Sequence, residues 1–95
     1  MESGEELFGS VYQRGDVIFQ QGEIGDKMYI IQSGAVVISR QQGEREVILA
    51  LREKGDFFGE MALFEEEQRF ATATAIRQTR LLSLTQASLF DKVQH

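Results

Sequence analysis

Six short runs of strand-forming residues, divided by glycine-containing turns, constrain what this chain can fold into more than any other feature. The runs cover 17–20, 28–33, 35–40, 46–51, 71–76 and 80–85, and the chain contains no proline. Short, regularly spaced runs rich in Val, Ile and Tyr are typical of β-sandwiches and barrels. The pattern predicts a mainly β fold, an antiparallel jelly roll or double-stranded β-helix barrel, with short flanking helices.

Glycine marks the predicted turns. The dipeptide Gly-Asp occurs at 15–16, 25–26 and 55–56. Glycine adopts φ above zero at no steric cost, and aspartate can close a turn with its side chain, so all three pairs are predicted to form tight turns. The polar segment 41–45 fits the loop of a hairpin that joins 35–40 to 46–51.

In two of these runs the alternation along the strand predicts which side chains lie on each of its two faces. Val47, Leu49 and Leu51 are predicted to share one face of their strand, with Ile48 and Ala50 on the other. A later run divides in the same way, with Ala71, Ala73 and Ala75 on one face and Thr72 and Thr74 on the other.

The aromatic residues are candidates for the core. Neighbours in a strand point to opposite faces, so one of Phe57 and Phe58 is predicted to be buried. The other aromatic residues predicted in the core are Tyr12, Phe19, Tyr29, Phe64 and Phe90.

One helix is predicted near the end of the sequence, at 86–94. Thr85 is placed to cap its first turn, and Leu84 and Leu89 are placed to form a hydrophobic staple across it. A further helical turn is indicated at 1–8.

Composition excludes several function classes. The 95 residues suffice for one domain, taken as 1–95, and carry a net charge of −5. Such a surface repels duplex nucleic acid, so no nucleic-acid partner is expected. Cysteine is absent and His95 is the only histidine, which excludes thiolate catalysis, zinc–thiolate sites and serine–histidine catalysis.

No targeting or membrane segment is recognisable. The first seven residues, MESGEEL, lack the apolar stretch of a signal peptide. No apolar run approaches the ~20 residues that span a bilayer. We therefore expect a cytoplasmic protein, or a cytoplasmic part of a larger one, without a membrane segment.

The segment FGEMALFEEEQRF, residues 58–70, interrupts the β pattern. Residues 60–67 are nearly all good helix formers, which predicts a short helical turn that starts after Gly59. Unpaired N–H groups at the start of a helical turn favour an anion, and the planar guanidinium of Arg69 suits phosphate oxygens. Glu60 could accept hydrogen bonds from sugar hydroxyls. The alternative is a surface ion pair between Glu60 and Arg69.

FGEMALFEEEQRFATATA resembles the phosphate-binding cassette of cyclic nucleotide-binding domains, and the preceding GDVIFQQGEIGDKMYIIQSGAVVI resembles their early strands. The resemblance implies that Glu60 binds the ribose 2′-hydroxyl and Arg69 the cyclic phosphate, helped by N–H groups near Ala62 and Phe70. Gly59 would allow close backbone approach and Ala71 would be the small residue beside the pocket. The implied ligand-binding set within the cassette at 58–71 is Gly59, Glu60, Met61, Ala62, Arg69, Phe70 and Ala71, with no catalytic residue, metal or cofactor.

The cassette departs from the family pattern at three places. Gln68 replaces the usual proline, Phe70 replaces a small residue, and the loop carries the acidic run 65–67. The missing hydroxyl at position 70 favours cAMP over cGMP as the ligand. The departures also support an alternative: a degenerate member of the family that serves as an interaction or oligomerisation scaffold without binding nucleotide. An enzyme of the related double-stranded β-helix kind is disfavoured, since such barrels place histidines inward for their metal.

The resemblance implies a non-enzymatic sensor that signals to an effector domain or protein outside this chain. The family usually has a longer C-terminal helix that covers the base of the nucleotide, and we expect residues 1–95 to lack it.

Overall fold

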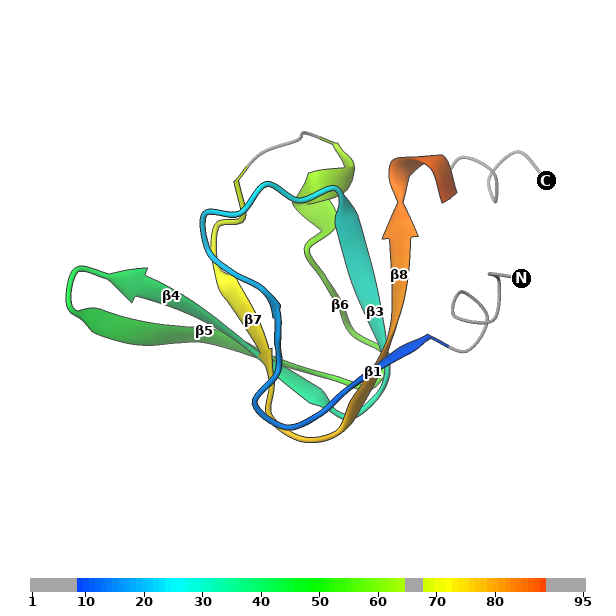
Figure 1. Ribbon diagram of the computed structural model, residues 1–95, viewed down its shortest axis with the longest axis horizontal. Helices are drawn as coiled ribbons and strands as arrows, with labels where there is room; N and C mark the ends of the chain where they lie inside the picture. The colour runs from blue at the N-terminus through cyan, green and yellow to red at the C-terminus, as the bar shows by residue number, and fades with distance from the viewer. Residues whose placement is uncertain (1–8, 65–67, 89–95) are drawn as a thin grey trace.

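The computed structural model describes residues 9–64 and 68–88, which form two antiparallel four-stranded sheets (Figure 1). The first sheet has the order β1-β8-β3-β6 and the second has the order β2-β7-β4-β5. The strands are β1 (Ser10–Tyr12), β2 (Val17–Phe19), β3 (Lys27–Ser33), β4 (Ala35–Gln42), β5 (Arg45–Glu53), β6 (Phe57–Phe58), β7 (Thr72–Ala75) and β8 (Thr79–Thr85). The predicted jelly-roll fold is confirmed, and all six predicted runs are strands. The short strands β1 and β6 were not predicted.

The core lies between the two sheets. Tyr29, Ile31, Phe58 and Leu81 of the first sheet pack against Val36 and Ala73 of the second. Phe58 is buried while Phe57 is exposed, as their alternation predicts. Ala71, Ala73 and Ala75 are all buried, which confirms the period of two in that run. Phe64 was wrongly predicted in the core: it follows the last helical residue and is 70% exposed.

Two of the three predicted Gly-Asp turns form. At Gly15-Asp16 and Gly55-Asp56 the glycine has φ near +90°, and the aspartate carboxylate accepts a hydrogen bond from the N–H three residues earlier. The prediction for Gly25-Asp26 is wrong, because that glycine does not have positive φ. The turn lies instead at Gln20–Glu23, where Gly22 has φ of 93° and the Glu23 carboxylate plays the part of the aspartate.

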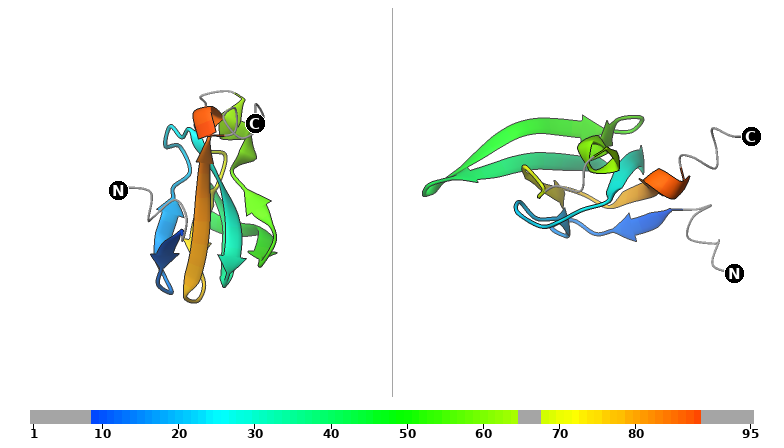
Figure 2. Two further views of the ribbon diagram at one scale, coloured as in Figure 1. Left: turned by 90° about the vertical axis from the view of Figure 1, so that its right-hand side faces the viewer. Right: turned by 90° about the horizontal axis from the view of Figure 1, so that it is seen from above.

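The hairpin of β4 and β5 extends beyond the rest of the sandwich (Figures 1 and 2). Its turn is tighter than predicted, because the strands pair as far as Gln42 and Arg45. The register shifts along the hairpin, since Ser39 pairs with Ile48 but Ile38 pairs with Ala50.

Leu49 is therefore the extra residue of a β-bulge, and the predicted faces are wrong. Cross-strand partners share a face, so Val47, opposite Arg40, lies on the same face as Ala50, opposite Ile38. Ile48 and Leu51 share the other face.

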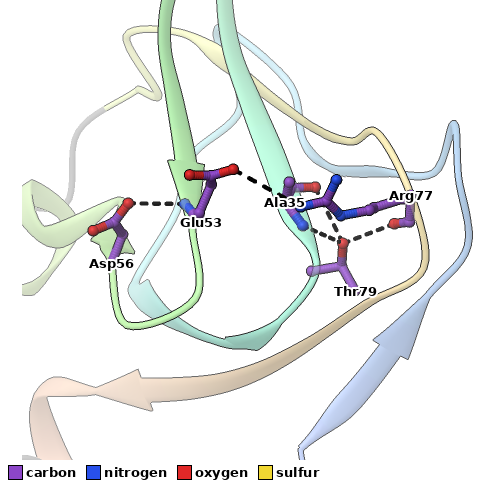
Figure 3. Close-up of polar contacts among 5 residues, drawn as sticks. All are labelled: Ala35, Glu53, Asp56, Arg77 and Thr79. Carbon is purple, nitrogen blue, oxygen red and sulfur yellow. Dashed lines mark hydrogen bonds and ion pairs between the residues drawn. The ribbon is translucent and has the colours of Figure 1, made fainter.

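The buried Thr79 forms hydrogen bonds that link two turns (Figure 3). These turns lie at the end of the sandwich remote from residues 60–63. The hydroxyl of Thr79 accepts a hydrogen bond from the N–H of Ala35 at 3.1 Å and lies 2.7 Å from the carbonyl oxygen of Arg77. Arg77 also forms an ion pair with Glu53, whose N–H donates to Asp56. This network stabilises the end of the fold away from the site described below.

The predicted helical elements form where the structure describes them. A 3₁₀ turn, η1 (Glu60–Leu63), follows Gly59. Residues 86–88 are helical, and the hydroxyl of Thr85 accepts a hydrogen bond from the N–H of Ser88 at 3.1 Å, which confirms the cap. The rest of the predicted helix with Leu89 and Phe90, the acidic run 65–67 and the indicated turn at 1–8 lie outside the described residues.

Candidate functional site

A cavity of about 310 Å³ opens beside η1. Its volume is at the lower end of the roughly 300–1,000 Å³ typical of small-molecule sites. It is lined by Phe19, Ile38, Arg52, Phe58, Gly59, Glu60, Met61, Ala62, Gln68, Arg69, Phe70 and Ala71. All seven residues in the predicted ligand-binding set therefore lie around one cavity, whose remaining walls come from β2, β4, β5, β6 and Gln68.

Gly59 allows the chain to pass close to the arginine. It is the N-cap of η1 with φ of 77°, and a Cβ there would lie 2.9 Å from Nη1 of Arg69 and 3.3 Å from the carbonyl oxygen of Lys27. Both the positive φ and the lack of space require glycine. The carbonyl of Gly59 accepts a hydrogen bond from the N–H of Ala62 at 3.2 Å, which closes the turn.

The backbone of Arg69 is fixed by the loop between β2 and β3. Its N–H donates to the carbonyl of Glu23 at 2.6 Å, and its carbonyl accepts from the N–H of Gly22 at 2.8 Å. Gln68, the residue in place of the family's proline, forms a β-bridge with Ile24. The same loop therefore fixes the backbone from which the Arg69 side chain extends, and it also packs against one side of that side chain.

The guanidinium of Arg69 is packed on several sides. It lies over the ring of Phe19, with 3.9 Å between Cζ and the ring centroid. Nη2 donates to the carbonyl of Lys27 at 2.8 Å, and Nη1 donates to that of Gly59 at 3.3 Å. On another side Gly25 lies so close that a Cβ would overlap the guanidinium. Arg69 is only 8% exposed, so its position is set by the protein rather than by solvent.

The electrostatics of Arg69 are unusual for a buried cation. Burial lowers its pKa, while Tyr29, Asp26 and Glu23 act in the opposite direction. The guanidinium remains charged at any accessible pH. Within residues 9–64 and 68–88 no carboxylate lies at ion-pair distance from it, and its buried Nε has no hydrogen-bond partner. Buried charges are almost always paired, so this side chain has the character of a site for an anion.

Glu60 lies at the start of η1, lines the cavity and is partly buried. It forms neither an ion pair nor a hydrogen bond with Arg69, so the surface-pair alternative is wrong. Its carboxylate can accept two hydrogen bonds from neighbouring hydroxyl groups of a ligand.

Phe70 lies at the rim of the cavity rather than in its depth. It is 67% exposed, and the guanidinium of Arg40 from β4 lies over its ring, with 4.2 Å between Cζ and the centroid. Arg40 also donates from Nη1 to the carbonyl of Phe70. Most of the Phe70 side chain is thus open to solvent, in contrast to the buried Arg69.

Several residues of the site were not predicted. Phe19 and Gly25 shape the position of Arg69. Arg52 lines the cavity, and Arg40 contacts Phe70. Gly25 was assigned to a turn, although a glycine without a turn role signals close packing. The contributions of β4 and β5 depend on sheet register, which the strand pattern does not define.

Two other kinds of site find no support in the described part of the chain. No three acidic or histidine side chains there are grouped so as to hold a metal ion. No helix among these residues has the length and apolar character that crossing a bilayer requires.

The fold is an antiparallel jelly roll with one interrupting helical turn, and a buried arginine and a partly buried glutamate share one cavity of the size of a small-molecule site. The model of the cyclic nucleotide-binding domain family matches residues 10–95, and the chain belongs to this family.

Named relatives are regulatory proteins. The chain is 43% identical over 75 residues to the cyclic AMP receptor protein of Thermus thermophilus, and 43% identical over 83 residues to a cAMP-dependent protein kinase regulatory subunit of Schizosaccharomyces pombe. The matches cover 78% and 86% of this chain but only 35% and 18% of those proteins.

A solved structure supports the same placement. The cAMP-bound form of EAL enzyme Bd1971 superposes with a TM-score of 0.80 at 32% identity, covering 90% of this chain and 23% of that one. The same protein has also been solved in a cGMP-bound form.

Proposed function

We propose that this domain binds a cyclic nucleotide, cAMP in preference to cGMP, and passes its occupancy to an effector outside this chain. The observation that carries the proposal is the buried, positively charged Arg69 on the cavity wall, with no carboxylate at ion-pair distance from it among the described residues. A cyclic phosphate supplies the single negative charge that such a site lacks.

The geometry suggests how the ligand is held. Nη1 and Nη2 of Arg69 each use one N–H on a protein carbonyl, which leaves one N–H on each of these two nitrogens for phosphate oxygens, while Nε is buried against Gly25. Glu60 lies on the same cavity and is proposed to accept hydrogen bonds from the ribose 2′-hydroxyl. The proposed ligand-binding set is unchanged: Gly59, Glu60, Met61, Ala62, Arg69, Phe70 and Ala71.

The preference for cAMP rests on residue 70 and on the relatives. Phe70 provides no hydroxyl to a guanine amino group, and the two named relatives above carry cAMP in their names. We propose that the domain acts as a sensor and performs no catalysis itself. The single-domain extent 1–95 and the cytoplasmic location remain predictions.

A thermal-shift measurement tests the proposal. A ligand that binds only the folded state stabilises it by about 2.7 kcal/mol at 100 times its Kd. We expect millimolar cAMP to raise the Tm clearly, cGMP to raise it less, and adenosine, which lacks the phosphate, to leave it unchanged. Equal shifts with adenosine and cAMP would remove the role of the phosphate, and no shift with any cyclic nucleotide would contradict the proposal.

One observation favours the alternative scaffold function. Arg69 already donates hydrogen bonds to the carbonyls of Lys27 and Gly59, as a purely structural arginine would. The acidic run 65–67, which lies just before Arg69 in the sequence, adds negative charge that would repel a bound anion. Replacing these three glutamates by glutamine and measuring cAMP affinity distinguishes a nucleotide-binding domain from a scaffold. A binding domain gains affinity for cAMP at low salt, whereas a scaffold shows no binding in either form.

A further inference from the structure

A side chain outside the cavity ties the β4–β5 hairpin to the loop that holds Arg69. Oε1 of Gln21 accepts a hydrogen bond from the N–H of Gln41 at 2.7 Å, and Nε2 of Gln21 donates to the carbonyl of Gln41 at 3.3 Å. The side-chain amide thus pairs with this backbone as a neighbouring strand would. The strand β7 pairs with β4 only as far as Ser39, so Gln21 holds the hairpin where the neighbouring strand no longer does.

The same loop fixes the arginine. The N–H of Gln21 donates to the hydroxyl of Thr72 at 2.9 Å, and the backbone of Arg69 forms hydrogen bonds with the next two residues of the loop. Residues 21–23 therefore contact the hairpin through one side chain and Arg69 through their backbone. Gln21 itself does not line the cavity, so it can affect a ligand only through these neighbours.

A second contact ties the hairpin to the cassette one residue away. Arg40 donates from Nη1 to the carbonyl of Phe70, and its guanidinium lies over the ring of Phe70. Residues 40–47, here called the outer hairpin, extend beyond the pairing with β7. Within the described part of the chain, the contacts of Arg40 and Gln41 thus join the outer hairpin to the two segments that position Arg69.

We propose that Gln21, supported by Arg40, couples the outer hairpin to Arg69, so that occupancy of the cavity slows the opening of the hairpin. The inference rests on the proposed function, since it requires an anionic ligand at Arg69. Proteins open locally in cooperative units. An opening that releases residues 21–23 frees the hairpin and displaces Arg69 in one step, and a ligand that binds only the closed form opposes that opening by the factor 1 + [L]/Kd.

Hydrogen exchange followed by NMR tests the coupling, with each protein measured free and with cAMP at about 100 times its own Kd. The N–H of Gln41, which Gln21 accepts, and the other amides of the outer hairpin are the reporters. In the parent we expect cAMP to slow their exchange by about 10- to 100-fold. The amides of Gln13 and Glu53, each held by an aspartate carboxylate in a turn remote from the cavity, should exchange at the same rate with and without cAMP.

Two variants remove the contacts in turn. Gln21→Ala should lose most of the cAMP-dependent slowing in the outer hairpin, and the double variant Gln21→Ala/Arg40→Gln should lose the rest. A merely structural role for Gln21 would speed exchange in the free and bound forms alike and leave their ratio unchanged. Gln20→Ala is the matched control, because Gln20 is exposed and its side chain forms no hydrogen bond within residues 9–64 and 68–88. It should keep the ratio of the parent.

The parent tests the inference even if a variant fails to fold. Binding of cAMP by calorimetry without any slowing of exchange in the outer hairpin would overturn the coupling alone and leave the proposed function standing. An unchanged ratio in the double variant would do the same. A parent that binds no cAMP at millimolar concentration would overturn the proposed function and the coupling with it.

Discussion

Gly25 and Arg69 are packed so closely that no side chain fits on residue 25. A Cβ there would overlap Nε, Cζ and Nη2 of the arginine, and Gly25 does not have positive φ. Residue 25 must therefore be glycine because the guanidinium occupies the adjacent space, and not because a turn requires positive φ.

Gly25→Ala is therefore expected to displace Arg69 and to weaken cAMP binding by at least about tenfold, since a hydrogen bond to a charged group contributes about 1.5–3 kcal/mol. Calorimetry measures the affinity. Gly43→Ala is the control, because Gly43 has positive φ with open space around it. That variant should lose stability through backbone strain and keep its affinity. Equal affinity in the parent and Gly25→Ala would show that the close packing is irrelevant to the site.

The ring of Phe19 provides a second support for the guanidinium. Phe19→Leu should weaken cAMP binding by about 5- to 30-fold, because a desolvated cation–π contact contributes roughly 1–2 kcal/mol. The substitution also removes core contacts with Tyr29 and Phe58. Ile31→Val, a core change elsewhere expected to cost about 0.5–1.5 kcal/mol, corrects for this loss of stability. If both variants bind cAMP alike, Phe19 has only a packing role.

Tyr29 gives the fold a specific sensitivity to alkaline pH. Burial raises the pKa of Tyr29 above its ordinary value of 10.0, with Tyr12 adding to the effect and Arg69 opposing it. A raised pKa in the folded state means that the stabilising contribution is complete below pH 10 and is lost as pH rises through the folded-state pKa.

Between pH 8 and pH 10.5 the parent should therefore lose more stability than Tyr29→Phe, which has no ionising hydroxyl. Urea unfolding at both pH values measures the difference, and the other titrating groups are common to both proteins. Parallel losses would show that Tyr29 ionises as easily in the folded state as in the unfolded state.

The strand pattern and the cassette could be predicted because each rests on local sequence. Alternating Ala and Thr in 71–75 defines a buried face without knowledge of its partners, and Gly59 marks the start of η1 wherever the segment packs. The faces of β5 could not be predicted, because the bulge at Leu49 depends on pairing with β4.

The supports of Arg69 likewise depend on tertiary structure. Lys27, whose carbonyl accepts from Arg69, is 42 residues away from it in sequence. The ring of Phe19, which contacts the guanidinium, belongs to β2. No local pattern identifies a backbone carbonyl as a hydrogen-bond partner. The turn at Gly22-Glu23 does not carry the Gly-Asp pattern, because glutamate takes the place of aspartate and accepts the equivalent hydrogen bond with its carboxylate.

Titration of cAMP into the parent and into Arg69→Lys tests the central claim most directly. The variant keeps the positive charge but loses the planar fork, so a site built around a buried guanidinium and a phosphate should lose about 10- to 150-fold in affinity, as expected when a charged hydrogen bond of 1.5–3 kcal/mol is lost. The account predicts saturable one-to-one binding by the parent and this loss in the variant. Equal affinities, or no binding by the parent at millimolar cAMP, would contradict it.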